Sequence, residues 1–145
     1  MFDAISERLA NADVLIMAAA VADYTPVVCA DQKIKKKEGD MTIELKRTRD
    51  ILKYAGENKK DGQIICGFSM ETENLLENSR KKLTSKNCDL IAANSISESG
   101  AGFKTDTNRI TLISRDSVRE LSLMSKLEAA DILLDEIAKM RDKIV

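Results

Sequence analysis

Three side chains that can contact a ligand stand at the ends of short apolar runs: Asp23, Phe68 and Asn94. In an open α/β sheet, ligands bind beyond the carboxyl ends of the strands. If the apolar runs are neighbouring parallel strands, these side chains lie on one rim of the sheet and face one ligand. Each also has a simpler interpretation, since Asp23 can be a turn residue, Phe68 a core ring and Asn94 a cap of the next segment.

Lysines form the second group with possible chemistry. Residues 33–37 are Lys-Ile-Lys-Lys-Lys. This run is either a solvated loop or a mobile basic flap that closes over phosphate, where lysine acts as a point charge on an anionic transition state. Lys82 and Lys86 are four residues apart and therefore share one face of a helix. They are either solvent-facing charges that favour the end of that helix or a pair that receives a triphosphate.

Several other chemistries are excluded by residue types that the chain lacks. There is no histidine, which excludes Ser-His-Asp and Cys-His catalysis and histidine-ligated metal sites. The three cysteines have no CxxC spacing, and Cys66 and Cys88 lie inside apolar runs, so we expect buried, reduced thiols rather than redox or nucleophilic ones. Neither GxGxxG nor GxxxxGK[ST] occurs, which disfavours a nicotinamide-dependent dehydrogenase.

Composition limits the partners. The chain has 145 residues, 43% hydrophobic and 32% charged, which predicts one globular domain. Lysine and arginine number 23 against 24 aspartate and glutamate, so the basic excess of a nucleic-acid-binding protein is missing. The longest apolar run, residues 14–22, is too short to span a bilayer. We therefore expect a cytoplasmic protein that binds neither nucleic acid nor membrane.

Three continuous apolar runs, residues 14–20, 64–68 and 90–93, are typical of strands that are covered on both faces, as in a parallel sheet. Between the last two, residues 73–86 have helical spacing, which makes a strand–helix–strand unit. The apolar face of this helix is expected to contain Leu75, Leu76, Ser79 and Leu83. The chain opens with an amphipathic helix carrying Phe2, Ile5 and Leu9.

The remaining elements are shorter. Residues 41–47 alternate in hydropathy, which predicts a half-exposed strand at an edge or in a separate small sheet. A short helix is expected over residues 50–57, with Thr48 before it as the N-cap. Residues 109–114 and 118–121 flank a turn and predict a hairpin.

The last helix opens with a capping box, Ser125-Lys-Leu-Glu128. Its apolar face is expected to contain Leu127, Ala130, Leu134 and Ile137. Together the elements predict an α/β, Rossmann-like three-layer fold with a mainly parallel sheet plus a β-hairpin.

Six strings occur in the order and at the spacing of one family. They are AAAVADY at 18–24, KIKK at 33–36, DIL at 50–52, GF at 67–68 with ET at 71–72, DLIAAN at 89–94, and GF at 102–103 with Asn108. Together they resemble the phosphopantothenate–cysteine ligase family, CTP-dependent bacterial enzymes of coenzyme A biosynthesis. No single string is specific, but six in order are, and the resemblance covers residues 4–140.

The resemblance implies an activity. The carboxylate of 4′-phosphopantothenate attacks the α-phosphate of CTP with Mg²⁺, giving an acyl-cytidylate and pyrophosphate. The amine of cysteine then displaces CMP to form the amide. This chemistry needs positioning and charge stabilisation rather than a histidine base, in keeping with the composition. The family also implies a homodimer, with residues 41–47 as a candidate for pairing across the two-fold axis.

The resemblance also implies roles for single residues. Lys33 on the flap is the expected catalytic residue, acting in the second half-reaction. Asp23 is expected at the ribose or metal side of the nucleotide and is the candidate Mg²⁺ ligand. The other implied contacts with CTP are Ala19 and Phe68 around cytosine, Arg49, Asp50, Ile51 and Leu52 at the start of the short helix, Lys82 and Lys86 at the triphosphate, and Asn94 on the rim.

The chain departs from the family in two ways. Proline is usual where this sequence has Arg49, a position at the start of a helix that arginine also tolerates. The glycine-rich segment and asparagine that open the family's ligase domain should precede Met1. So should the decarboxylase found in most bacterial relatives, to which FMN belongs. We therefore interpret residues 1–145 as a single domain, the C-terminal portion of a ligase domain, with little activity alone.

One alternative from another functional class stays open. The chain could be a non-catalytic nucleotide-binding or regulatory module of the same fold. A glycine-rich segment upstream in the source gene would favour the enzyme, and a true start codon at Met1 would favour the module.

Overall fold

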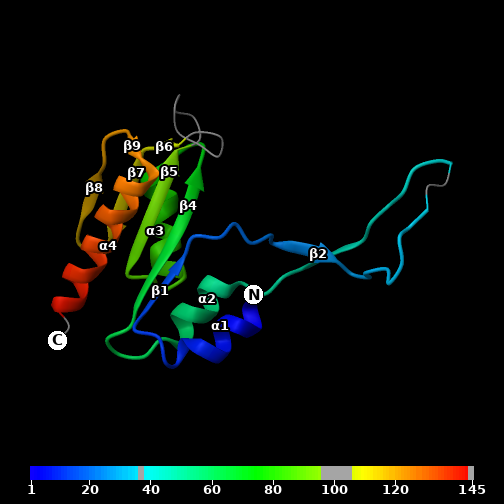
Figure 1. Ribbon diagram of the computed structural model, residues 1–145, viewed down its shortest axis with the longest axis horizontal. Coiled ribbons are helices and arrows are strands. Elements are labelled where there is room, and N and C mark those ends of the chain that lie inside the picture. The colour runs from blue at the N-terminus through cyan, green and yellow to red at the C-terminus, as the bar shows by residue number, and fades with distance from the viewer. Residues whose placement is uncertain (36–37, 96–105, 144–145) are drawn as a thin grey trace. The chain divides into compact units, whose positions relative to one another are not determined.

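The computed structural model describes residues 1–35, 38–95 and 106–143 (Figure 1). It separates into two compact units. We call Met1–Ala19 with Ile51–Val145 the sheet unit, and Ala20–Asp50 the hairpin unit. The expectation of a single domain over residues 1–145 stays a prediction.

The sheet unit is built on a five-stranded sheet of order β1-β4-β5-β7-β8. The strands are β1 (Val14–Met17), β4 (Ile64–Glu71), β5 (Leu90–Ser95), β7 (Ile110–Ser114) and β8 (Val118–Glu120). The pairs β1–β4 and β4–β5 are parallel, whereas β5–β7 and β7–β8 are antiparallel. The predicted strand–helix–strand unit and the predicted hairpin are both present, and the predicted fold class is confirmed.

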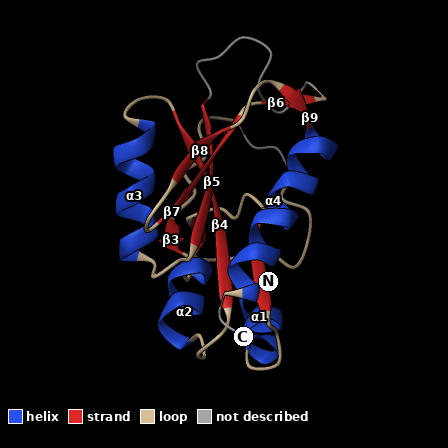
Figure 2. Cartoon of the chain, turned by 90° about the vertical axis from the view of Figure 1, so that its left-hand side faces the viewer, coloured by secondary structure: helices blue, strands red, loops and turns tan. Residues whose placement is uncertain are grey.

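Helices cover both faces of this sheet. One face packs against α1 (Phe2–Leu9), α2 (Ile51–Asn58) and α3 (Leu75–Ser85), and the other against α4 (Lys126–Asp142). Figure 2 shows α4 on the opposite side of the sheet from α2 and α3. A short ladder of β6 (Thr107–Asn108) with β9 (Met124–Ser125) lies just before α4. The result is the predicted three-layer arrangement.

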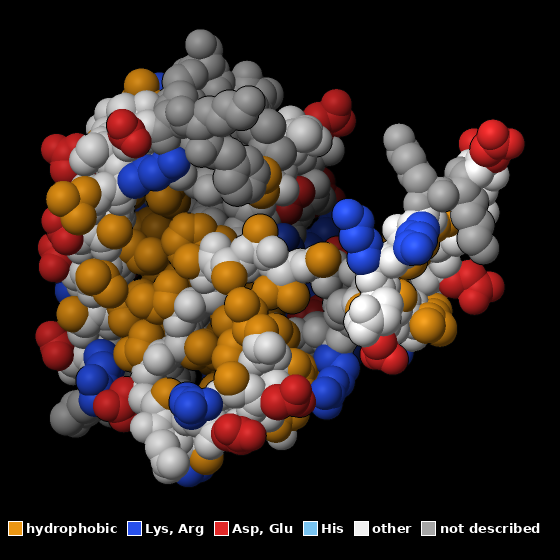
Figure 3. All heavy atoms as spheres, turned by 45° about the vertical axis from the view of Figure 1, so that its right-hand side comes forward, with side chains coloured by type: hydrophobic (Ala, Val, Ile, Leu, Met, Phe, Trp, Pro, Cys, Tyr) orange, Lys and Arg blue, Asp and Glu red, His pale blue; other side chains and the backbone are white. Residues whose placement is uncertain are grey.

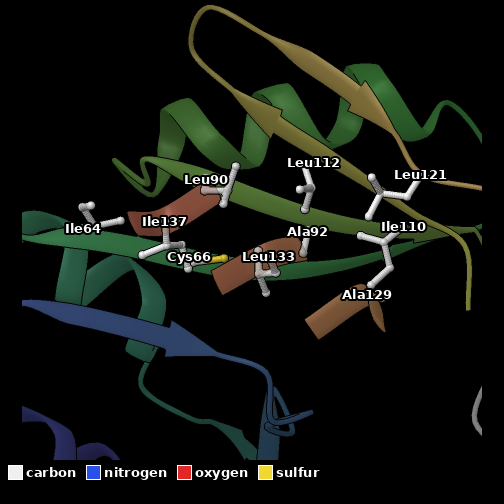
Figure 4. Close-up of a cluster of buried hydrophobic side chains, with 10 residues drawn as sticks. All are labelled: Ile64, Cys66, Leu90, Ala92, Ile110, Leu112, Leu121, Ala129, Leu133 and Ile137. Carbon is white, nitrogen blue, oxygen red and sulfur yellow. The ribbon is translucent and has the colours of Figure 1, made fainter. Parts of the chain in front are cut away.

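The core beneath α4 explains why this helix forms where it does (Figure 4). Ala129, Leu133 and Ile137 are buried against Cys66 and Ala92 of the sheet. Of the predicted apolar face only Ile137 is buried, while Leu127 and Leu134 are 73% and 53% exposed and Ala130 is also exposed. Residues 132–134 are all apolar, so spacing alone does not decide which stripe of the helix faces the sheet.

Two more expectations on the sheet unit are corrected. The first run forms a strand only over Val14–Met17, and its residues are half-buried because β1 lies at an edge of the sheet. Figure 3 shows hydrophobic side chains over a broad area of the sheet unit's surface. Leu76 of α3 is 43% exposed, whereas Ser79 and Leu83 are buried as predicted.

The hairpin unit contains β2 (Tyr24–Pro26) and β3 (Leu45–Arg47), which pair antiparallel in a two-stranded sheet. This confirms the separate small sheet. Only Leu45–Arg47 of residues 41–47 forms the strand, however, and all three residues are exposed rather than alternately buried, because within this unit the strand pairs only with β2. Thr48 is not a helix cap, because α2 begins at Ile51. Instead its hydroxyl donates to the carbonyl of Ala22 at 2.7 Å, and its backbone N–H donates to the carbonyl of Asp23.

The capping box at the start of α4 is confirmed. The Ser125 hydroxyl accepts from the Glu128 backbone N–H, and the Glu128 carboxylate accepts from the Ser125 backbone and hydroxyl at 2.9 and 2.7 Å. These two hydrogen bonds, the one from the hydroxyl first, lower the pKa of Glu128 below its ordinary value of 4.5. The part of the box that the Glu128 carboxylate makes therefore contributes most where Glu128 is ionised, whereas the bond from its backbone N–H to Ser125 does not depend on that charge.

We expect Ser125→Ala to lower the free energy of unfolding by about 1 kcal/mol at neutral pH. A lowered carboxyl pKa stabilises the fold above the unfolded-state pKa and loses that effect as pH falls through the folded-state value. The difference in the free energy of unfolding between wild type and Ser125→Ala should therefore become smaller below pH 4.5. Urea unfolding at neutral and acidic pH measures it, with the exposed Ser122→Ala as control. An undiminished difference in acid would contradict the role of Glu128.

Within the described parts of the chain, no helix is both long and apolar enough to cross a membrane.

Candidate functional site

The carboxyl ends of β4 and β5 form the rim on which the sequence placed Phe68 and Asn94. The register pairs Phe68 with Ala92 and Met70 with Asn94, so these residues lie on neighbouring strands. Phe68 is half-buried and packs against the core beneath α4. The Asn94 side chain accepts a hydrogen bond from Asn108 at 3.2 Å. Phe68 is therefore at least partly a core ring, as its simpler interpretation has it, and Asn94 is an anchored amide near the end of β5.

A polar cluster joins the end of β4 to α3. The Lys82 ammonium donates to the Ser69 hydroxyl at 3.1 Å, and that hydroxyl donates to Glu71 at 2.5 Å. The other Glu71 oxygen accepts from the Asn78 side chain at 3.2 Å. Lys82 also pairs with Glu71 at 3.7 Å. This cluster places Lys82, the residue predicted to contact the triphosphate, beside β4, the strand that carries Phe68.

Lys86 lies one helical turn beyond Lys82 as the C-cap of α3, and its backbone N–H donates to the Lys82 carbonyl. The Lys86 backbone also touches α2 closely. A Cβ built on Gly56 would lie 1.8 Å from the Lys86 carbonyl oxygen. The absence of a side chain at Gly56 therefore lets α2 approach the end of α3 and set the position of Lys86.

The start of α2 lies beside the same strand. A Cβ at Gly67 would lie 2.6 Å from a methyl of Leu52, so Gly67 lets this side chain rest on the α3 side of β4. Ile51 is buried. In the sheet unit, Ile51 and Leu52 are thus packing residues, which leaves their backbone as the part that can contact a ligand.

The other predicted site residues divide between the two units. Ala19 ends the first segment of the sheet unit and is exposed. The exposed residues Asp23, Lys33, Arg49 and Asp50 belong to the hairpin unit. Residues 36, 102 and 103 of the family strings, and Lys37 of the lysine run, lie outside the described residues. Among those that are described, no three His, Cys, Asp or Glu side chains gather as a metal site, and Asp23 stays a predicted Mg²⁺ ligand.

Sequence reasoning assigned no role to Ser69, Glu71 or Asn78. A signal was nevertheless present. Residues two apart in a strand point to the same side, and residues four apart in a helix share a face. Ser69 with Glu71, and Asn78 with Lys82, satisfy these rules, but only the packing of α3 on β4 shows that the two pairs meet.

As predicted, Cys66 and Cys88 are buried thiols that form no disulfide, whereas Cys29, for which the sequence made no prediction, is exposed. Burial raises the pKa of Cys66 to about 12, with a smaller contribution from nearby Cys88. Figure 4 shows its sulfur within the core. A neutral, buried thiol is a poor nucleophile.

We therefore expect a thiol reagent to modify only Cys29 in the folded protein and all three cysteines after unfolding in denaturant. Mass spectrometry after brief alkylation locates the modified residues, and Cys29→Ser serves as control. Rapid modification of Cys66 in the folded protein would contradict its burial.

Comparison with known proteins agrees with this architecture. The sequence profile of the DNA/pantothenate metabolism flavoprotein C-terminal domain family matches residues 1–140. The coenzyme A biosynthesis bifunctional protein CoaBC of Bacillus subtilis (strain 168) is 48% identical over 141 residues, covering 97% of this chain and 34% of that protein. CoaBC of Escherichia coli (strain K12) is 36% identical, covering 97% of this chain and 35% of that protein.

A crystal structure of the C-terminal domain of CoaBC superposes with a TM-score of 0.77 at 37% identity, covering 98% of this chain and 61% of that one. The chain thus spans about a third of the curated relatives it matches. The family match extends over nearly all of its residues and includes both strands of the rim and α3. The chain belongs to the DNA/pantothenate metabolism flavoprotein C-terminal domain family.

Proposed function

We propose that this chain is the CTP-binding part of a phosphopantothenate–cysteine ligase, which joins 4′-phosphopantothenate to cysteine in coenzyme A biosynthesis. The observation that carries the proposal is the end of β4 in the sheet unit, where Phe68 packs on the α4 side of the strand and the strand-to-helix cluster that holds Lys82 lies on its α3 side. Membership of the family and the name of the B. subtilis relative support the pathway.

The proposed reaction has two steps. The phosphopantothenate carboxylate attacks the α-phosphorus of CTP, which forms an acyl-cytidylate and releases pyrophosphate. The amine of cysteine then attacks the acyl carbon, loses a proton and expels CMP. Neither step requires a histidine, because binding and charge stabilisation can supply the catalysis. Mg²⁺ would neutralise phosphate charge, and it commonly takes one or two carboxylates with phosphate oxygens, a role that the exposed Asp23 fits.

The residues of the chain would act as follows. Phe68 and Ala19 contact cytosine, and Asn94 supports the rim. Lys82 and Lys86 stabilise the triphosphate. The backbone of Arg49, Asp50, Ile51 and Leu52 contacts the nucleotide at the start of α2. Lys33 acts in catalysis after the acyl-cytidylate has formed.

We further propose that the protein is a cytoplasmic homodimer and that the hairpin unit makes the dimer contact. This unit exposes several large apolar side chains: Val28 (79%), Met41 (64%), Ile34 (62%), Ile43 (56%) and Leu45 (56%). They border or adjoin an apolar groove of about 580 Å³ within the unit. Apolar side chains gathered on one segment are typical of a protein interface.

Light scattering coupled to size exclusion tests the dimer. Ile43→Lys should give a monomer, since a charge at that position would be buried in the interface. Ser122→Lys, at an exposed position of the sheet unit, serves as control. A monomeric wild-type chain, or a dimer unaffected by Ile43→Lys, would refute the contact.

Calorimetric titration with CTP and Mg²⁺ tests the main proposal. We expect saturable binding of CTP that ATP cannot match. If neither this chain nor a chain extended upstream binds CTP, the proposal is wrong. Specific binding in an extended protein that makes no amide product would instead support the non-catalytic module.

A further inference from the structure

The contacts of Lys82 form a relay through a buried hydroxyl. Ser69 is 3% exposed, and its hydroxyl accepts from the Lys82 ammonium at 3.1 Å while donating to Glu71 at 2.5 Å. The direct separation of Lys82 and Glu71 is 3.7 Å, longer than a hydrogen bond. Glu71 therefore acts on Lys82 both as a direct ion pair and through Ser69, whose hydroxyl hydrogen is turned to the carboxylate and whose lone pairs are left for the ammonium.

Glu71 is itself fixed. Its side chain is 17% exposed, and its second oxygen accepts from Asn78, four residues before Lys82 on α3. A carboxylate held by neutral donors on two elements cannot turn freely toward solvent. Ser69 and Glu71 share one side of β4, and Asn78 and Lys82 share one face of α3. The hydrogen bonds from Lys82 to Ser69 and from Asn78 to Glu71 therefore form a ring across the strand–helix contact that the backbones of β4 and α3 close.

Such a ring matters for phosphate binding. A lysine is a point charge on a flexible stem, and ordering that stem reduces the affinity it can provide. In the ring, Lys82 uses one donor on Ser69 and keeps a side chain that is 33% exposed, so it is ordered before any ligand arrives. This gain in affinity is available only to a ligand whose phosphates reach the Lys82 ammonium.

We propose that Glu71 and Ser69 are positioning residues, which hold the Lys82 ammonium ready for the terminal phosphates of a nucleoside triphosphate. The proposal rests on the CTP-binding function above and deepens it. It adds that the rim selects the triphosphate over the monophosphate, so that the product CMP, which lacks the terminal phosphates, gains nothing from the ring and is released.

The experiment measures dissociation constants of CTP with Mg²⁺, and of CMP, by calorimetry for wild type, Glu71→Gln, Lys82→Met and the double variant. We expect Glu71→Gln to raise the dissociation constant of CTP about fivefold or more and to leave that of CMP within about twofold of the wild-type value. In the Lys82→Met background, Glu71→Gln should weaken CTP no further, since the residue through which it acts is gone. Glu77→Gln, on an exposed carboxylate of the same helix that pairs with Lys81, is the matched control.

Ser69→Ala is a second variant that breaks the relay without changing any charge, and it should reproduce the loss for CTP alone. Thermal melts confirm that each variant is folded. Additive effects in the double variant, an equal loss for CMP, or tighter CTP binding by Glu71→Gln would each overturn the positioning role while leaving CTP binding itself intact. Wild-type protein that fails to bind CTP, or Lys82→Met that binds it normally, would overturn the nucleotide assignment and this inference with it.

Discussion

Changing Gly56 to alanine should lower the free energy of unfolding by about 3 kcal/mol and the melting temperature by about 10 °C. The new Cβ would lie 1.8 Å from the Lys86 carbonyl oxygen and 2.8 Å from its carbonyl carbon, which are backbone atoms. The junction cannot easily open. The Asn87 side chain donates to the Gly56 carbonyl at 2.8 Å, and Arg115 donates to the same Asn87 side chain at 2.9 Å.

The sign of this change in stability distinguishes a steric clash at Gly56 from the ordinary preference of helices for alanine. In the interior of an ordinary helix, alanine stabilises relative to glycine by about 1 kcal/mol. Ala130→Gly at an exposed position of α4 should show that ordinary preference, with a loss of about 1 kcal/mol. Gly67→Ala should cost less than Gly56→Ala, because its nearest neighbour is the movable end of Leu52. A Gly56→Ala protein as stable as wild type in urea unfolding would show that α2 can shift from the end of α3.

Changing Lys33 to glutamine should reduce amide formation by about a hundredfold or more in the complete ligase that we propose, with CTP affinity within about twofold. The physical reason is that a neutral side chain can no longer stabilise negative charge that develops during the transfer. Because Lys33 is proposed to act after the acyl-cytidylate forms, the first turnover should still release pyrophosphate, and release of CMP should slow.

Quenched-flow measurement of pyrophosphate and CMP separates the two steps. Lys35→Gln is the matched control, since Lys35 is also an exposed lysine of the same run. Wild-type turnover of the Lys33 variant would remove this residue from the mechanism. A large loss of CTP affinity would make Lys33 a nucleotide ligand rather than a catalytic residue.

The buried sheet was predictable because its central strands are hydrophobic on both faces. Runs 64–68 and 90–93 became β4 and β5, with α3 between them. Prediction was poorer for a strand at the edge of the sheet, and for a helix on which two adjacent rows of apolar residues could each face the core. β1 is half-buried at the sheet edge, and α4 turns Leu133 rather than Leu134 to the core. In both places the partner surface, and not the local pattern, decides which side chains are covered.

The candidate site was predictable to a similar degree. Phe68 and Asn94 follow from the rule that ligands bind where parallel strands end, and β4 and β5 do end side by side. β4, however, continues past its apolar run to Glu71, so Ser69 and Glu71 belong to the strand. Their contact with Lys82 joins residues that no local pattern relates, and it required the packed structure. The roles of Asp23 and Lys33 stay predictions.

The strands β1 and β4 are hydrogen-bonded neighbours, yet the whole hairpin unit and α2 lie between them in the chain. The entropy lost on closing such a loop grows only with the logarithm of its length, by about 0.6 kcal/mol for each doubling. Insertions or deletions in Ala20–Asp50 should therefore affect the stability of the sheet little, so that the constraints on this segment come from the ligand and dimer contacts proposed for it rather than from the sheet. Because this loop separates β1 from β4 along the chain, their pairing is a long-range contact. We therefore expect the consecutive elements β4, α3 and β5 to assemble first during folding and β1 to join them later.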